Sequence, residues 1–176
     1  MMNILVLYSS RTGNTKKVAE AIQSALPEGT PCLSMAEAPA DLSAYDLIFA
    51  GYWVDRGTAN AEAKTFLEGL HHKNVALFAT LGADPTSDHA QKSLDEGAKL
   101  LPKETDVVGT FICQGAVDPK IIEMMYKKFP EGHPHGRSPE RDARHAEAAK
   151  HPDEADLQRA FDFAADILHW FEGGGQ

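Results

Sequence analysis

Short apolar runs alternate with segments of helical periodicity along most of this chain, and this alternation is what most constrains the fold. The strand-like runs are Asn3–Tyr8, Thr30–Met35, Asp46–Tyr52, Asn74–Thr80 and Asp106–Cys113. The helical patterns are Gly13–Leu26, Ala61–Leu70, Ser87–Leu101 and Glu154–Phe171. Such alternation is typical of α/β proteins with a parallel sheet. Because crossovers between parallel strands are right-handed, we expect a doubly wound, five-stranded parallel sheet in the order 2-1-3-4-5.

We expect a single domain covering residues 1–176, because 176 residues of which 43% are hydrophobic can form one substantial core. An α-helical insert of about residues 116–152 follows the fifth strand. Its two helical segments are Pro119–Phe129 and a polar one from about Ser138 to Lys150. The insert separates the sheet from the last helix.

Charge and cysteine content limit the partners and the location. A net charge of -9 argues against nucleic acid and anionic membranes, which require a surplus of Lys and Arg. No run reaches the roughly 20 apolar residues that cross a bilayer. Cys32 and Cys113 lie in apolar runs without metal-ligand spacing, which indicates free buried thiols and no disulfide. We therefore expect a cytoplasmic protein without membrane insertion.

The loop after the first strand is rich in hydrogen-bonding groups. Ligands of doubly wound sheets bind at the carboxyl ends of the strands, where this loop lies. Its hydroxyls come from Ser9, Ser10, Thr12 and Thr15. Gly13 and Asn14 tolerate a tight backbone, and the next helix offers unpaired N–H groups and its positive dipole end. The loop therefore predicts a phosphate site in which Arg11 adds peripheral charge.

Other phosphate-handling sites do not match. The chain has no G-x-x-x-x-G-K-[ST] motif, and this loop has one of the three glycines of a dinucleotide fingerprint. It lacks the acidic residues of a receiver domain and the cysteine of a small phosphatase. A hydroxyl-rich helix cap without a ligand is the remaining alternative. Nothing resembles a catalytic triad or an acid/base pair, so we predict no catalytic side chains.

The segment Ser10-Arg11-Thr12-Gly13-Asn14-Thr15, directly after a strand ending in Tyr8, resembles the phosphate loop of the flavodoxin family. The resemblance implies a flavodoxin-like fold and FMN as cofactor, with this loop holding the 5′-phosphate. It also implies an electron-transfer protein that receives electrons from a donor reductase and passes them to an acceptor protein.

The same resemblance assigns two further loops to the flavin ring. In Gly51–Thr58, Tyr52 and Trp53 would stack on the ring, Gly57 would permit a peptide to reorient, and Arg56 would add a positive charge. Core packing is the alternative for each aromatic ring. The other loop contacts the pyrimidine edge through backbone groups of Thr80, Leu81 and Gly82. No tyrosine follows Gly82, so the outer face of the flavin would be less covered.

The insert, together with the second and third loops, resembles a bacterial flavodoxin-like subgroup linked to bilirubin and haem tetrapyrrole reduction. This implies an alternative function in which haem or a linear tetrapyrrole (bilin) binds or is reduced on the same surface. In an extended loop His133 and His135 would point the same way, as candidate haem ligands. A solvated lid with incidental histidines is the other interpretation, and no further metal site is predicted. A less favoured function is an NAD(P)H-dependent flavin reductase.

Overall fold

A five-stranded parallel sheet forms the centre of the computed structural model, which describes residues 2–174. Its strands are β1 (Ile4–Tyr8), β2 (Cys32–Ser34), β3 (Leu47–Asp55), β5 (Asn74–Leu81) and β6 (Asp106–Gln114). They lie in the order β2-β1-β3-β5-β6. A two-residue strand, β4 (Thr58–Ala59), pairs antiparallel with the end of β3. The predicted order 2-1-3-4-5 is therefore confirmed for the parallel strands.

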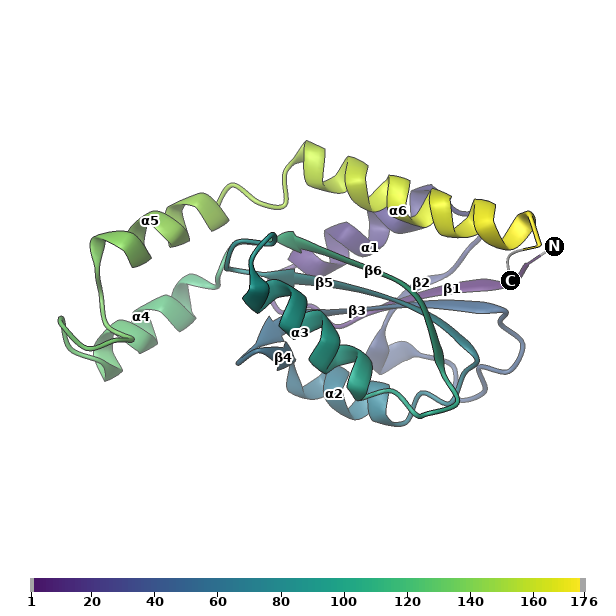
Figure 1. Cartoon of the computed structure of the whole chain (residues 1–176), viewed down its shortest axis with the longest axis horizontal. Coiled ribbons are helices and arrows are strands. Elements are labelled where there is room, and N and C mark those ends of the chain that lie inside the picture. Colours follow the sequence, from purple (N-terminus) through teal and green to yellow (C-terminus); the bar gives the residue numbers. More distant parts are fainter. Residues whose placement is uncertain (1, 175–176) are drawn as a thin grey trace.

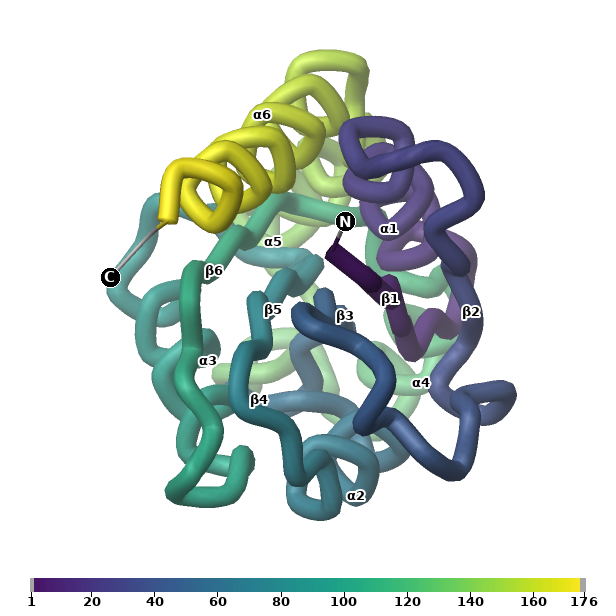
Figure 2. The backbone as a smooth tube through the Cα atoms, turned by 90° about the vertical axis from the view of Figure 1, so that its right-hand side faces the viewer, coloured from purple at the N-terminus to yellow at the C-terminus, as the bar shows by residue number. Residues whose placement is uncertain are grey.

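Helices cover both faces of the sheet (Figures 1 and 2). One face packs against α1 (Asn14–Ser24) and α6 (Glu154–Glu172), and the other against α2 (Ala61–Glu68) and α3 (Asp88–Lys99). A short 3-10 helix, η1 (Met35–Glu37), follows β2. The central strands β1, β3 and β5 are almost entirely apolar because both of their faces are buried. None of the helices in residues 2–174 combines the length and apolar character needed to span a bilayer.

The third strand is longer than predicted. We expected a strand ending at Tyr52, but β3 continues to Asp55, turns through Arg56 and Gly57, and returns as β4. The φ angles of 53° at Arg56 and 81° at Gly57 are those that a tight two-residue hairpin requires. The segment expected to be an open loop is therefore a β-hairpin.

The insert forms an arm, defined here as residues 117–150, that projects from the carboxyl edge of the sheet (Figure 1). It contains α4 (Pro119–Lys128) and α5 (Pro139–Ala148). The backbone N–H of Ala116 donates to the carbonyl of His151 at 3.0 Å, which holds the two ends of the arm together. No residue of α4 is buried, so the arm contributes little to the core.

The two cysteines are free thiols, as predicted. Cys113 is buried, as predicted, whereas Cys32 is only half-buried, which differs from the prediction. Burial raises the pKa of Cys113 to about 12, which leaves this thiol unreactive at neutral pH.

Candidate ligand-binding cleft

A cleft opens at the carboxyl edge of the sheet, where the predicted ligand loops meet. Its cavity volume is about 160 Å³, below the roughly 300–1,000 Å³ of enclosed small-molecule pockets, so the cleft is shallow and a larger ligand bound there extends into solvent. Nine predicted site residues line it: Ser10, Arg11, Thr12, Asn14, Thr15, Trp53, Thr80, Leu81 and Gly82. The topology therefore brings together loops that lie far apart in the sequence.

The phosphate loop and the first turn of α1, which border this cleft, contain backbone donors without acceptors among the described residues. Gly13 adopts a φ of 98° and precedes α1 without a side-chain cap, and its N–H donates to Ser10 Oγ at 3.0 Å. The first helical hydrogen bond runs from Lys17 N–H to the Gly13 carbonyl. Within residues 2–174, no acceptor serves the N–H groups of Thr12, Asn14, Thr15 and Lys16. Such donors at a helix N-terminus form an anion site.

Side-chain hydroxyls complete this donor set. Ser10 Oγ accepts from Gly13 and Thr12 Oγ1 accepts from the Asn14 amide at 3.3 Å, so both hydroxyl hydrogens stay available to a ligand. Thr15 and Thr80 are buried at the floor, with their hydroxyl oxygens 2.9 Å apart. One of these two hydroxyls donates to the other, which leaves a single hydrogen for a ligand. These residues fit the phosphate of an organic ester.

Neighbouring aromatic residues of β3 face opposite layers, because side chains alternate along a strand. Trp53 is half-buried and lines the cleft. Tyr52 is fully buried beneath α3, where its hydroxyl donates to the Ser93 carbonyl at 3.2 Å. A Cβ on Gly97 would lie 2.2 Å from that hydroxyl, so the ring fits closely against the helix. The expectation that Tyr52 stacks on a ligand is therefore corrected: Trp53 alone is placed to do so.

Four other predicted residues lie beside the cleft or support it. Ser9 is buried, and its hydroxyl donates to Glu62 at 2.6 Å and accepts from Asn60 at 2.8 Å. Asn60 also accepts from the Trp53 N–H, so Ser9 positions the hairpin and does not line the cleft. Gly57 and Thr58 line an adjoining hollow on the α3 side of the hairpin. Gly13 shapes the phosphate loop through its backbone.

One wall of the cleft was not predicted from the sequence. It is formed by Gly115, Ala116, Val117, Asp118 and Ile121, at the end of β6 and the start of the arm. Arg11 donates to Asp118 at 2.9 Å, and this hydrogen bond is the largest of the contacts that lower the pKa of the Asp118 carboxyl. The signal was available, because β6 also ends at the carboxyl edge, where ligands of such sheets bind.

The candidate haem ligands lie away from the cleft. His133 and His135 are exposed at the tip of the arm, where both rings contact Phe129. The seven residues of α4 that follow Ile121 separate them from the cleft wall, which corresponds to roughly 10 Å of helix. The histidines and the cleft therefore do not form one pocket in this structure.

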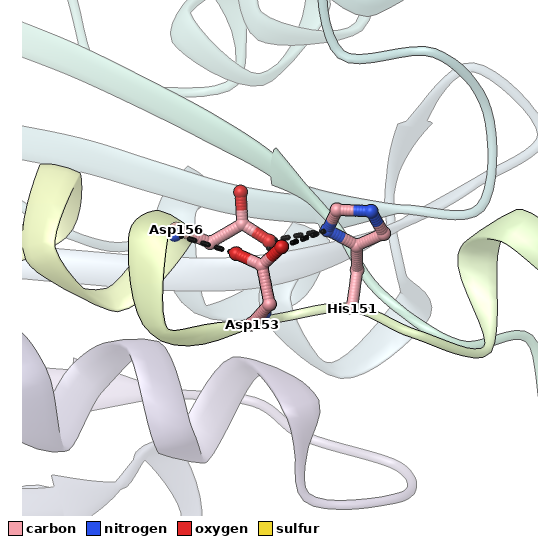
Figure 3. A group of neighbouring side chains, drawn as sticks. All are labelled: His151, Asp153 and Asp156. Carbon is pink, nitrogen blue, oxygen red and sulfur yellow. Dashed lines mark hydrogen bonds and ion pairs between the residues drawn. The ribbon is translucent and has the colours of Figure 1, made fainter.

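A cluster of ionisable groups joins the arm to α6 (Figure 3). His151 Nδ1 lies 2.5 Å from the buried carboxylate of Asp156 and 3.7 Å from Asp153. Both oxygens of Asp156 are engaged, one by Arg159 and the other by His151 and the Asp153 N–H. The three possible metal ligands lie within 4.8 Å of one another, but these hydrogen bonds account for the arrangement. The cluster is a structural joint with a capping box.

The fold and the loop geometry define a class of protein. The sequence model described as the flavodoxin domain matches residues 5–165, which is most of the chain. The chain therefore belongs to the flavodoxin domain family.

Curated relatives and solved structures agree with this assignment. The flavodoxin-like domain-containing protein BilS of Clostridioides difficile (strain CD3) is 35% identical over 176 residues, covering 95% of this chain and 97% of the relative. A BilS of Clostridium symbiosum (strain WAL-14163) is 27% identical, covering 89% of this chain and 90% of the relative.

The solved structures are more distant in sequence. A flavodoxin from the domain Archaea superposes with a TM-score of 0.55 at 17% identity, covering 97% of this chain and 99% of that one. Oxidised flavodoxin 2 of Bacillus cereus gives a TM-score of 0.53 at 20% identity, covering 95% and 98%. These likenesses concern the fold.

Proposed function

We propose that this protein binds FMN and carries electrons between a donor reductase and an acceptor protein. The proposal depends mainly on one observation. Four N–H groups in the phosphate loop and the first turn of α1 have no acceptor within residues 2–174, namely those of Thr12, Asn14, Thr15 and Lys16. A phosphate ester satisfies these donors, and the dipole of α1 favours its negative charge. Membership of the flavodoxin domain family supports the same ligand.

The remaining cleft residues would orient the flat ring. Trp53 offers an aromatic face, which pairs favourably with another flat ring system. Leu81 and Gly82 line the cleft and would border the ring edge, although their carbonyls already accept from the Gly115 N–H at 2.8 Å and the Gln114 side-chain amide at 3.2 Å. Bound FMN supplies redox chemistry that no side chain provides, and the chain tunes it by positioning and local charge.

The contacts favour this function over a tetrapyrrole pocket built from the cleft and the histidines together, because His133 and His135 lie at the arm tip. Binding or reduction of haem or a linear tetrapyrrole by this protein remains the proposed alternative function. Titration with haem, followed by absorbance spectroscopy, tests this alternative. A Soret shift that is lost in the His133→Ala, His135→Ala variant would indicate that haem is ligated at the tip of the arm.

Titration of the flavin-free protein with FMN and with riboflavin tests the proposal. Riboflavin lacks the phosphate, so we expect FMN to bind much more tightly. In the Thr12→Ala, Thr15→Ala variant, FMN affinity should fall by about 1.5–6 kcal/mol, since hydrogen bonds to a charged group contribute about 1.5–3 kcal/mol each and Thr15 and Thr80 have one free hydrogen between them. Riboflavin affinity should change little, which also shows that the variant is folded. Equal affinity of the unmodified protein for both ligands, measured by calorimetry, contradicts phosphate binding by this loop.

A further inference from the structure

The wall that the arm contributes to the cleft is apolar where it faces the opening. Val117 and Ile121 line this wall, one just before α4 and the other in its first turn. Their neighbour Ile122 is half-buried but does not line the cleft. The helix therefore directs one isoleucine into the ligand site and leaves the adjacent one outside it.

Specific contacts fix this wall against the other two loops of the cleft. The Asn14 side-chain amide donates to the Ala116 carbonyl at 2.9 Å, which ties the wall to the phosphate loop. Val117 packs onto Gly82 so closely that a Cβ at position 82 would lie 2.4 Å from the Val117 side chain. The wall is thus in contact with the loops on both sides of the site.

The loop after β5 has no large side chain with which to cover a flat ligand. Gly82 and Ala83 are small, and Asp84 Oδ1 accepts from Thr86 N–H and Thr86 Oγ1 at 2.8 and 2.7 Å. The Asp84 carboxylate is therefore held toward the start of α3. The arm instead adds two apolar side chains, Val117 and Ile121, to the same cleft that Trp53 lines.

We propose that Val117 and Ile121 form the outer cover of the bound flavin ring, so that the ring lies between Trp53 and the first turn of α4. This inference rests on the proposed binding of FMN and names residues of the arm as part of its site. The arm then belongs to the cofactor site, and the position of α4 determines how much of the ring solvent reaches.

The test compares Ile121→Ser with Ile122→Ser, two equal changes on adjacent residues of α4. Burial of an isoleucine side chain against the ring predicts that Ile121→Ser weakens FMN binding by about 5- to 20-fold. Riboflavin binding should weaken by the same factor, because the contact is to the ring and not to the phosphate. Iodide should also quench the remaining flavin fluorescence more efficiently. Ile122→Ser should change neither affinity by more than about twofold.

The conservative variant Ile121→Leu should retain binding, which separates loss of the apolar contact from misfolding of α4. Unchanged affinity in Ile121→Ser, or an equal loss in Ile122→Ser, overturns the inference. Either result leaves the proposed function intact provided that the unmodified protein binds FMN. Failure of the unmodified protein to bind FMN overturns the proposed function itself.

Discussion

Tyr52 and Trp53 are adjacent on β3, but their side chains lie on opposite faces of the sheet, and only Trp53 lines the cleft. The run Leu47–Tyr52 is apolar throughout, so it has no alternation that would assign side chains to faces. The direction of each side chain is determined by the pairing of β3 with β1 and β5, which places Tyr52 toward α3 and Trp53 toward the cleft. The position of the Ser9–Thr15 loop at the cleft was predictable because the loop requires only the strand and helix on either side, and phosphate binding by it remains a prediction.

Arg56 is the residue at which local charge is expected to tune the bound cofactor. Its side chain lines the cleft, is 94% exposed, and contacts Asp55 at 4.0 Å. A nearby cation stabilises the anionic reduced flavin, so Arg56→Gln should make the reduction potential more negative by about 10–30 mV, the size of one solvent-screened charge interaction. Spectroelectrochemistry of the FMN-loaded protein measures this shift.

The size of the Arg56 effect should decrease as salt is added, because the guanidinium is exposed. Lys103→Gln is the matched control, since it removes an equal charge from the loop before β6, at the opposite edge of the sheet. The reduction potential of the Lys103→Gln variant should stay within a few millivolts of that of the unmodified protein, because Lys103 lies far from the cleft and its charge is screened. An equal shift in both variants would mean that net charge, and not the position of Arg56, sets the potential.

Among the elements, the joint between α5 and α6 responds to pH. When protonated, His151 donates from both ring nitrogens, from Nδ1 to Asp156 at 2.5 Å and from Nε2 to Glu147 at 3.2 Å. The hydrogen bond to Asp156 is the largest cause that raises the pKa of His151, and burial opposes it. The protonated histidine therefore stabilises the folded state at low pH, and this contribution is lost as pH rises through the raised pKa.

We accordingly expect His151→Gln to reduce the free energy of unfolding most below about pH 6.5, the ordinary histidine pKa, and progressively less above the raised value. Urea unfolding across this range measures the difference. His145→Gln should show the opposite slope, because burial of His145 lowers the pKa of that imidazole and its charged form destabilises the fold. A pH-independent loss in His151→Gln would show that His151 acts only through packing.

The elements of the sheet were predictable, whereas the role of the arm was not. Strand and helix periodicities are local, so the order of the five parallel strands and the helices between them could be inferred from the sequence, whereas the two-residue strand β4 could not. The contact between Asn14 and Ala116 joins residues 102 positions apart, and no local pattern encodes it. The same holds for Val117 on Gly82, which exists only because β5 and β6 pair. His133 and His135 could be identified as candidate ligands from the sequence, but their distance from the cleft could not, because it depends on how the arm is placed on the folded sheet.

At the scale of the whole molecule, we expect that the arm can be removed without unfolding the rest of the protein, but that its removal weakens ligand binding. Its ends are joined by the hydrogen bond from Ala116 to His151, α4 has no buried residue, and α5 buries only Ala148. Replacing residues 117–150 with a Gly-Ser linker of about four residues, a common loop length, should therefore preserve the folded core. Circular dichroism should show cooperative thermal unfolding with a Tm lowered by only a few degrees, about the effect of 1 kcal/mol.

Flavin binding then distinguishes the two parts of the arm. Removal of all of residues 117–150 takes away Val117 and Ile121, and should weaken both FMN and riboflavin binding by at least the 5- to 20-fold expected for losing one buried aliphatic contact, or about 1–2 kcal/mol. A matched variant that replaces only residues 130–137 keeps the first turn of α4 and removes His133 and His135. Its flavin affinity should equal that of the intact protein, because the tip lies far from the cleft. Equal loss in both variants would indicate that the arm acts as a whole through its tip, and not through the wall it contributes to the cleft.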